Sequence, residues 1–128
     1  MEMAKFFTRS KANVGAEVLL VLPDGTKTDK WIKVAGQDSD LYQGAFAEVR
    51  VKAVALSQAP ADKEAEAKAD YKKSVLEVVC KCVLDWNLDD ELTLENVATL
   101  LTEAPQIKAQ IETAIYDRKL FFVESSPS

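Results

Sequence analysis

The feature that most constrains the fold is an apolar repeat in the second half of the chain. Apolar side chains recur there at three- and four-residue intervals: Tyr71, Val75, Val78, Val79, Cys82, Val83 and Trp86. Residues with this spacing lie on one side of an α-helix, so the stripe they form must be buried against other elements. The repeat therefore predicts a core helix that continues to Trp86.

The segment before this repeat, residues 61–70, alternates Lys, Glu, Asp and Ala and carries no apolar stripe. Opposite charges one turn apart stabilise a helix whose surface is in water. We therefore predict a single helix over residues 62–86 with a solvated first half. A flexible linker between two helical parts is the alternative interpretation.

Three further apolar stripes predict amphipathic helices at residues 38–58, 94–103 and 105–119. The first follows Asp38-Ser39-Asp40, which supplies a helix cap and negative charge for the positive end of the helix dipole. The second follows Thr93, a further cap, and the third begins at Pro105, which suits the first turn of a helix. The chain is thus mostly helical from residue 38 onward.

A β-hairpin is predicted over residues 17–35, before these helices. Its strands are rich in Val, Leu, Trp and Ile, and Pro23-Asp24-Gly25-Thr26 between them is a turn sequence, because Pro presets φ and Gly supplies positive φ. The first strand is apolar on both faces, so we expect both to be covered. The fold class that follows is α+β and predominantly helical, with an N-terminal antiparallel β-hairpin followed by about four amphipathic helices.

A chain of 128 residues favours one domain, which we place at residues 17–123. Residues 1–16 show no clear period and are expected to form a flexible arm, or an edge strand around Lys5 to Thr8. Residues 124–128 are polar and are expected to be a disordered tail.

Charge and hydropathy exclude several classes of function. The net charge is −5, and an acidic chain repels both nucleic-acid phosphates and anionic membranes. The longest apolar run, residues 18–22, is far shorter than the roughly 20 residues that span a bilayer. We therefore expect a cytosolic protein that binds neither nucleic acid nor membrane.

We expect no catalytic, cofactor or metal site. The chain has no His, and Cys80 and Cys82 are too few for a usual zinc site, so they are interpreted as reduced thiols on a core helix. The acidic residues Asp85, Asp89, Asp90 and Glu91 offer paired carboxylates, but such loops are normally just solvated. They also lack the mid-loop Gly of a calcium loop.

Function is therefore sought in apolar side chains that bind another protein. Trp86 suits the core, whereas the adjacent Phe121 and Phe122 cannot both be buried by one neighbour, and exposed apolar patches mark protein contacts. We predict partner-binding roles for Trp31, Leu88, Phe121 and Phe122.

Several segments in a fixed order resemble a known family. They are Trp31 to Tyr42, Val83 to Leu88 with its Trp86-Asn87 pair, Leu94 to Leu101 with Glu95-Asn96-Val97, and Ala104 to Ile107 leading to Asp117 to Phe122. Over roughly residues 17–122 the chain is similar to the tail assembly chaperones of long-tailed (siphovirus-type) bacteriophages. None of these motifs is catalytic. The resemblance rests on the order in which they occur along the chain.

The resemblance implies a function. Such chaperones bind the long, apolar, helical tape measure protein, keep it soluble and help to recruit tail tube subunits. They act in the host bacterial cytoplasm and are expected to be absent from the mature virion. Many have a longer form made by ribosomal frameshifting, and the polar end Glu124 to Ser128 suits such a junction.

Other functions stay open at this stage. The chain could be a structural component of the phage particle or a head–tail connector. It could also be an acidic cytosolic protein-binding regulator, although its acids interleave with lysines. An unpaired strand edge and an apolar second face also favour a homo-oligomer.

Overall fold

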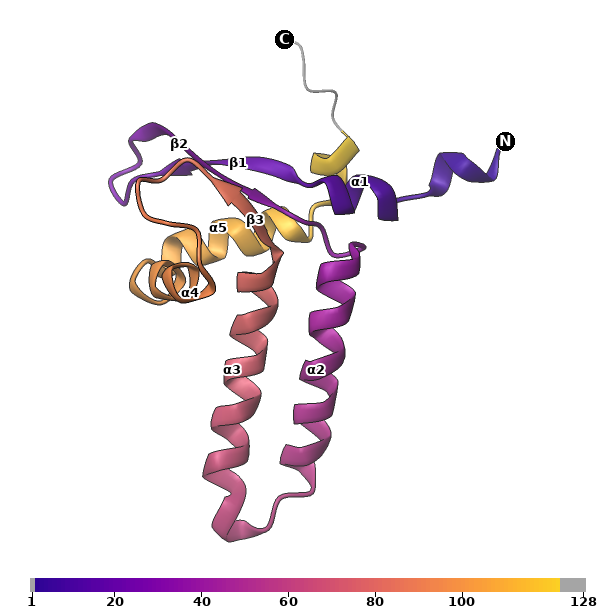
Figure 1. The fold of residues 1–128 in the computed structure, drawn as a ribbon, viewed down its shortest axis with the longest axis vertical. Helices are drawn as coiled ribbons and strands as arrows, with labels where there is room; N and C mark the ends of the chain where they lie inside the picture. The colour runs from indigo at the N-terminus through magenta and orange to yellow at the C-terminus, as the bar shows by residue number, and fades with distance from the viewer. Residues whose placement is uncertain (1, 123–128) are drawn as a thin grey trace.

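The computed structural model describes residues 2–122, so the predicted tail at 124–128 and the junction at Glu124 lie outside the described residues. Within residues 2–122 the chain forms a three-stranded antiparallel sheet and five α-helices, with short 3-10 turns (Figure 1). The predicted class, a mainly helical α+β fold with an N-terminal hairpin, is confirmed.

The hairpin is formed by β1 (Ala16–Val21) and β2 (Lys27–Val34), with Val18 opposite Ile32. Gly25 adopts the positive φ that the turn requires, at +90°. The backbone N–H of Thr26 donates to the Asp24 carboxylate at 2.9 Å, which tightens the same turn. The turn residues therefore act as the sequence predicted.

A third strand, β3 (Val83–Trp86), pairs with β2, so that Ile32 lies opposite Trp86 and Val34 opposite Val83. The predicted helix over residues 62–86 is therefore wrong in its last four residues. Val83 and Trp86 have helical spacing, but the free edge of β2 needs hydrogen-bond partners, and β-branched and aromatic residues suit a strand. Asn87 extends the pairing, because its side chain accepts from the Trp31 backbone N–H at 2.7 Å.

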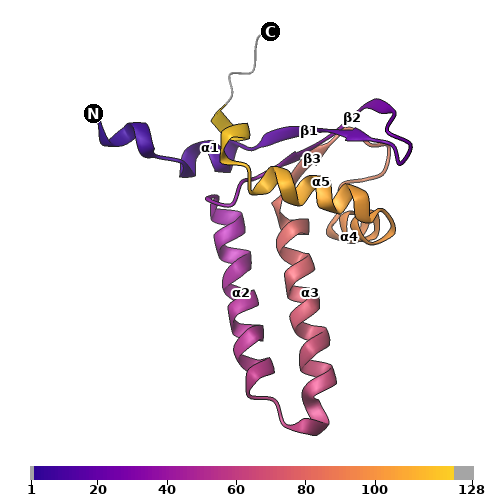
Figure 2. The same ribbon diagram turned by 180° about the vertical axis from the view of Figure 1, so that it is seen from behind.

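Two long helices, α2 (Asp40–Ser57) and α3 (Glu64–Cys82), follow β2 and precede β3 in the sequence. They lie side by side in the structure. They project from the sheet as a helical hairpin and are joined at the tip by the 3-10 turn η2 (Ala61–Lys63) (Figures 1 and 2). Residues 64–70 are helical and mostly exposed, which confirms the solvated first half of the predicted helix.

Helices α4 (Leu94–Glu103) and α5 (Pro105–Ile115) lie on the side of the sheet from which the hairpin projects (Figure 2). The core lies there and includes several side chains with at most 1% exposure: Ile32, Val34, Cys82, Leu101, Ile111 and Ile115. The bounds of α4 match the prediction, because Thr93 accepts a hydrogen bond from the Asn96 backbone N–H at 3.0 Å.

The predicted helix over 105–119 is too long by four residues. Its apolar stripe ends at Ile115, and Arg118 and Lys119 cannot continue it. The carboxylate of Asp117 accepts from the Lys119 backbone N–H at 3.1 Å, which starts a turn instead. A 3-10 helix, η3 (Arg118–Phe122), then follows.

The first residues form two short helical pieces, η1 (Met3–Phe6) and α1 (Arg9–Val14), and no strand forms around Lys5 to Thr8. Helix α1 is packed, since Ala12 is buried and its carbonyl accepts from the Gly36 N–H at 3.0 Å. Met3 to Phe7 project away from the body of the molecule (Figure 1).

Substitution of Gly15 by Ala should destabilise the junction between α1 and β1. Gly15 has φ of +92°, and an added Cβ would lie 2.7 Å from Leu84 Cδ1 and 2.8 Å from the carbonyl oxygen of Val34. Gly25→Ala is the matched control, because it has a similar φ of +90° with nothing within 4 Å.

We expect Gly25→Ala to lower the free energy of unfolding by about 1 kcal/mol through backbone strain alone. Gly15→Ala should lose about 2 kcal/mol more through the steric clash. Urea unfolding followed by circular dichroism measures both. Equal losses for the two variants would contradict the close approach of Leu84 and Val34.

Candidate partner-binding surfaces

Helix α2 is apolar on two sides, and within residues 2–122 the long helix α3 packs on only one of them. Its inner side buries Tyr42, Ala45 and Val49 against α3. The opposite side, which we call the outer face of α2, consists of Gly44, Ala47, Val51, Val54 and Ala55, and all of these are exposed. An apolar face of a helix is normally buried against another element.

Helix α3 does not share this property. Its exposed positions are largely charged, among them Glu66, Lys68, Lys72 and Lys73. On α2, Glu48 and Lys52 form an ion pair at 3.8 Å beside the outer face. Val51 and Val54 are 59% and 55% exposed, so the outer face is an apolar surface with charged residues beside it.

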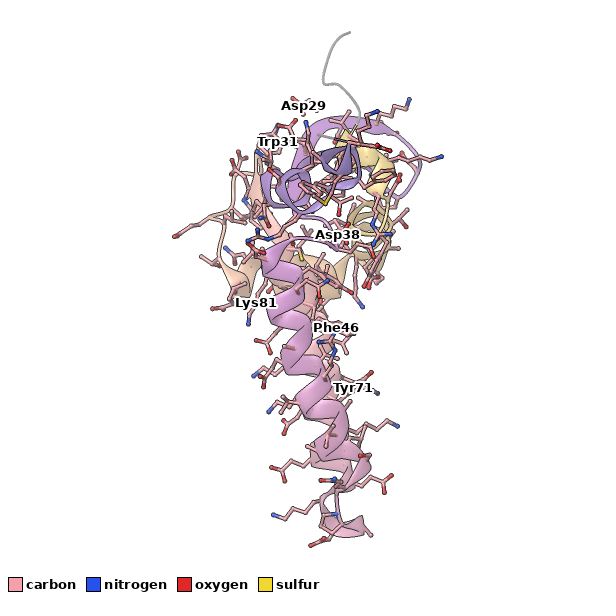
Figure 3. All side chains as sticks on the ribbon, turned by 90° about the vertical axis from the view of Figure 1, so that its right-hand side faces the viewer. Asp29, Trp31, Asp38, Phe46, Tyr71 and Lys81 are labelled. Carbon is pink, nitrogen blue, oxygen red and sulfur yellow. The ribbon has the colours of Figure 1, made fainter. Side chains whose placement is uncertain are left out.

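A second apolar feature, the aromatic groove, lies between α2, α3 and the end of α5. It has a volume of about 170 Å³ and is lined by Tyr42, Phe46, Val49, Tyr71, Val75, Val78, Val79, Glu112 and Tyr116. Phe46 and Tyr71 lie on the same side of the hairpin in Figure 3. The groove thus offers aromatic walls and one carboxylate.

The walls of the groove are ordered by contacts among the aromatic rings. Tyr42 stacks on Phe46 with ring centroids 5.7 Å apart and meets Tyr116 edge-on, also at 5.7 Å. The hydroxyls of Tyr42 and Tyr116 are 2.6 Å apart, and burial is the main cause that raises the pKa of Tyr42. The Arg50 guanidinium lies 4.9 Å from the Phe46 ring, a cation–π contact.

The other side of the hairpin is polar. A groove of about 460 Å³ there is lined by Gly44, Ala45, Glu48, Lys52, Asp70, Lys73, Ser74, Glu77 and Lys81. Lys81 appears on the side opposite Phe46 and Tyr71 in Figure 3. The apolar surface of the hairpin is therefore restricted to the aromatic groove and the outer face of α2.

Polar contacts fix the start of α2 to the rest of the molecule. The fully buried Ser39 caps the helix, accepting from the Tyr42 backbone N–H at 3.1 Å. Arg118 donates two hydrogen bonds to Asp38, at 2.7 and 3.0 Å, and these hold the pKa of that carboxyl below its usual value. Arg9 binds Asp40 in the same way at 2.7 and 2.9 Å.

The residues predicted from sequence as partner contacts lie in different places. Trp31 is half-buried on the outward face of the sheet, opposite Leu19. Leu88 is half-buried beside Trp86 and α4. Phe122, 43% exposed, lies at η3 near Thr8 and Arg118.

Phe121 is a core residue in the structure. It is 8% exposed, and its ring would lie 3.1 Å from a Cβ added to Gly36. Its ring is therefore not accessible to a partner in this structure. The outer face of α2 was missed, although Val51 and Val54, which lie outside the predicted stripe, were a signal for it.

The thiols are placed for packing. Cys80 and Cys82 are both buried, and burial raises the pKa of Cys82 to about 12, so it stays protonated at neutral pH.

No group of three or more His, Cys, Asp or Glu among residues 2–122 is placed to hold a metal ion. No helix in that range is both long and apolar enough to cross a membrane.

Comparison with known proteins identifies the family. Residues 3–121 match the family model of the phage tail assembly chaperones. The protein belongs to that family. Searches of curated proteins and of solved structures gave no match.

The motifs behind the resemblance have structural roles in the chaperone. The Trp86 indole N–H donates to the Asp90 carbonyl at 2.9 Å, and the Asn96 side chain donates to the Glu91 carbonyl at 2.8 Å. Asn87 binds β2 through its side chain, which also donates to the Asp29 carbonyl at 2.9 Å. These residues hold the loop between β3 and α4.

Acid should weaken the chaperone at the start of α2. Because the pKa of Asp38 is lowered in the folded state, its pairing with Arg118 stabilises the fold fully above the unfolded pKa of about 4. That stability is lost as the pH falls through the lower, folded pKa. Asp38→Asn should therefore reduce stability at pH 7 and flatten its pH dependence below about pH 5.

Thermal unfolding between pH 2 and 7 measures this effect. Arg118→Gln is the matched partner variant, and the double variant should lose no more than the larger single loss. Fully additive losses would show that the two side chains do not act as a pair.

Proposed function

We propose that this chaperone binds the tape measure protein of its phage, keeps it soluble until the tail tube forms, and helps to recruit tail tube subunits. Membership of the family supports a role in tail assembly. The observation that carries the finer proposal is the outer face of α2, an apolar helix surface whose Val51 and Val54 stay exposed within residues 2–122.

A helical, apolar client fits this surface. Helices pack by inserting the ridges of one into the grooves of the other, and small residues let the two backbones approach closely. On the outer face, Gly44, Ala47 and Ala55 are small, whereas Val51 and Val54 form the ridge. An amphipathic client helix would bury its apolar side here, as in helix-in-groove recognition.

The surface around the outer face suits a protein that must stay soluble while it is empty. Asp40, Glu48, Arg50 and Lys52 are charged residues on the same helix, and the whole chain carries a net charge of −5. Net charge opposes self-aggregation. Under this proposal the chaperone binds its client reversibly in the host bacterial cytoplasm. It leaves the client before the virion matures.

The outward face of the sheet is proposed as the contact for the tail tube subunit. Leu19, 63% exposed, and Trp31 form a cross-strand pair there, away from the helical hairpin. Trp side chains are enriched among the anchors of protein interfaces. Separate surfaces would allow the chaperone to hold both partners at once.

The first test is co-expression with the tape measure protein. Val51→Glu with Val54→Glu places two charges on the outer face without touching the core. Burial of a Val side chain contributes about 1.5 kcal/mol or more, so we expect the affinity for the client to fall by about a hundredfold. The soluble yield of the client should fall with it.

Lys72→Glu on α3 is the matched control, because it also changes the net charge by two units and lies on an exposed position of the other helix. It should keep the client soluble. If the double Val variant solubilises the client as well as the wild type does, the outer face of α2 is not the client surface.

The second test separates the two partners. Trp31→Ala should weaken capture of the tail tube subunit by about tenfold, the usual loss for an interface aromatic, while the client stays soluble. A pull-down with purified tube subunit measures this. Leu94→Ala is the control, since Leu94 is 56% exposed on α4, and equal loss of tube binding in both variants would contradict a specific role for Trp31.

A further inference from the structure

The aromatic groove contains a carboxylate that the proposed function does not use. Glu112 is the one charged residue in the lining of this groove, and the others are aromatic or aliphatic. It is half-buried on α5 and forms no ion pair within residues 2–122. An occupant with only apolar groups would bury this charge without a partner, which costs free energy. The carboxylate therefore favours an occupant that brings a positive charge.

The aromatic walls of the groove also attract positive charge. The face of an aromatic ring is electron-rich, and a cation within about 6 Å of the ring centroid is attracted to it. The rings of Tyr42 and Tyr116 stand at 85° to each other and form a corner, and Tyr71 adds a ring from α3. Ring faces beside a carboxylate suit an ammonium or guanidinium ion.

The chain already holds a cation against one of these rings. The Arg50 guanidinium lies 4.9 Å from the centroid of Phe46, and Arg50 is not part of the groove lining. Its charge beside the groove would repel a second cation and attract an anion. Variants of Arg50 and Glu112 therefore report the sign of the charge on the occupant.

The size of the groove suits one side chain of a partner protein. Its volume is about 170 Å³, whereas sites for drug-sized ligands measure about 300–1,000 Å³. Lys and Arg side chains combine an apolar stem with a charged head, so the stem suits the aliphatic lining at Val75 and Val78 and the head suits Glu112.

We propose that the aromatic groove binds a Lys or Arg side chain of the client, held by the carboxylate of Glu112 and the rings of Tyr71 and Tyr116. The net charge of −5 also favours a basic partner segment. The client is the source because a long chain bound at the outer face of α2 reaches the groove, on the other side of the same helix, with a neighbouring segment. This choice of source rests on the proposed function, whereas recognition of the cation does not.

Nuclear magnetic resonance of the full chain tests the cation site without any client. The probes are the blocked tripeptides Ala-Arg-Ala and Ala-Lys-Ala, and the neutral control has citrulline in place of Arg. We expect saturable shifts of the Tyr71 and Tyr116 ring signals with the basic peptides and none with the control. Absence of shifts with both basic peptides, or equal shifts with the citrulline peptide, would overturn the proposal.

Two substitutions should change the binding of the Arg peptide in opposite directions. Glu112→Gln should weaken it by about tenfold, because the shape is kept and the opposite charge is lost. Arg50→Gln should strengthen it by about threefold, because a repulsive charge is removed. Glu77→Gln is the matched control, since Glu77 is also half-buried but lines the polar groove on the other side of the hairpin. Opposite signs for the first two variants would mean that the groove takes an anion.

Photo-cross-linking from position 71 during co-expression with the tape measure protein tests the source. Benzoylphenylalanine in place of Tyr71 keeps an aromatic ring in the groove. Mass spectrometry should place the cross-link within one helical turn of a Lys or Arg of the client. A cross-link to a segment without a basic residue, or none while a complex forms, would overturn the assignment to the client.

The outer-face variant separates this inference from the proposed function. Val51→Glu with Val54→Glu should leave the binding of the Arg peptide unchanged, because neither residue lines the groove. If that variant still solubilises the client, the role of the outer face fails and the cation site stands. If the Arg and Lys peptides do not bind, the cation site fails and the outer face is untouched.

Discussion

The pairing of β2 with β3 is the interaction on which the rest of the structure depends. It joins the two strands that enter and leave the helical hairpin, so it closes the base of α2 and α3. Val34 lies opposite Val83, and the Ala35 N–H donates to the Cys82 carbonyl at 2.8 Å. Val34, Ala35 and Cys82 have no exposed surface, so this junction is in the driest part of the core. Both helices are thereby held side by side from their base, and the aromatic groove can form between them.

This architecture also explains why apolar surface is exposed. A helix on a projecting hairpin has one neighbour, and α2 uses one side to pack on α3. Its other side, with Val51 and Val54, is exposed in the part of the chain that the structure describes, yet it carries few charges. Exposed apolar area favours association, and charged groups on the same helix, such as Glu48 and Lys52, keep the surface hydrated at its margin. The proposed function requires that balance, because under it the client must be bound and later released.

Local sequence signals were enough to predict several elements. The elements that depend on contacts between distant parts of the sequence could not be predicted in this way. The bounds of α4 and the start of α2 follow from Thr93 and Ser39, whose caps depend only on residues three positions away. Strand β3 was missed because the spacing of Val83 and Trp86 fits a helix and a strand alike, and only the free edge of β2 decides between them. The burial of Phe121 depends on Gly36, far away in the sequence, and no local pattern reveals it. The aromatic groove likewise requires Tyr116 to reach Tyr42 from α5.

The measurement that tests the central claim most directly is photo-cross-linking during co-expression with the tape measure protein. A photoreactive amino acid is placed at Val51 on the outer face of α2, and at Lys72 on α3 in a separate variant. The account predicts a cross-link to the tape measure protein from position 51 and none from position 72. Cross-links from position 72 alone, or from neither position while a complex still forms, would contradict binding through the outer face of α2.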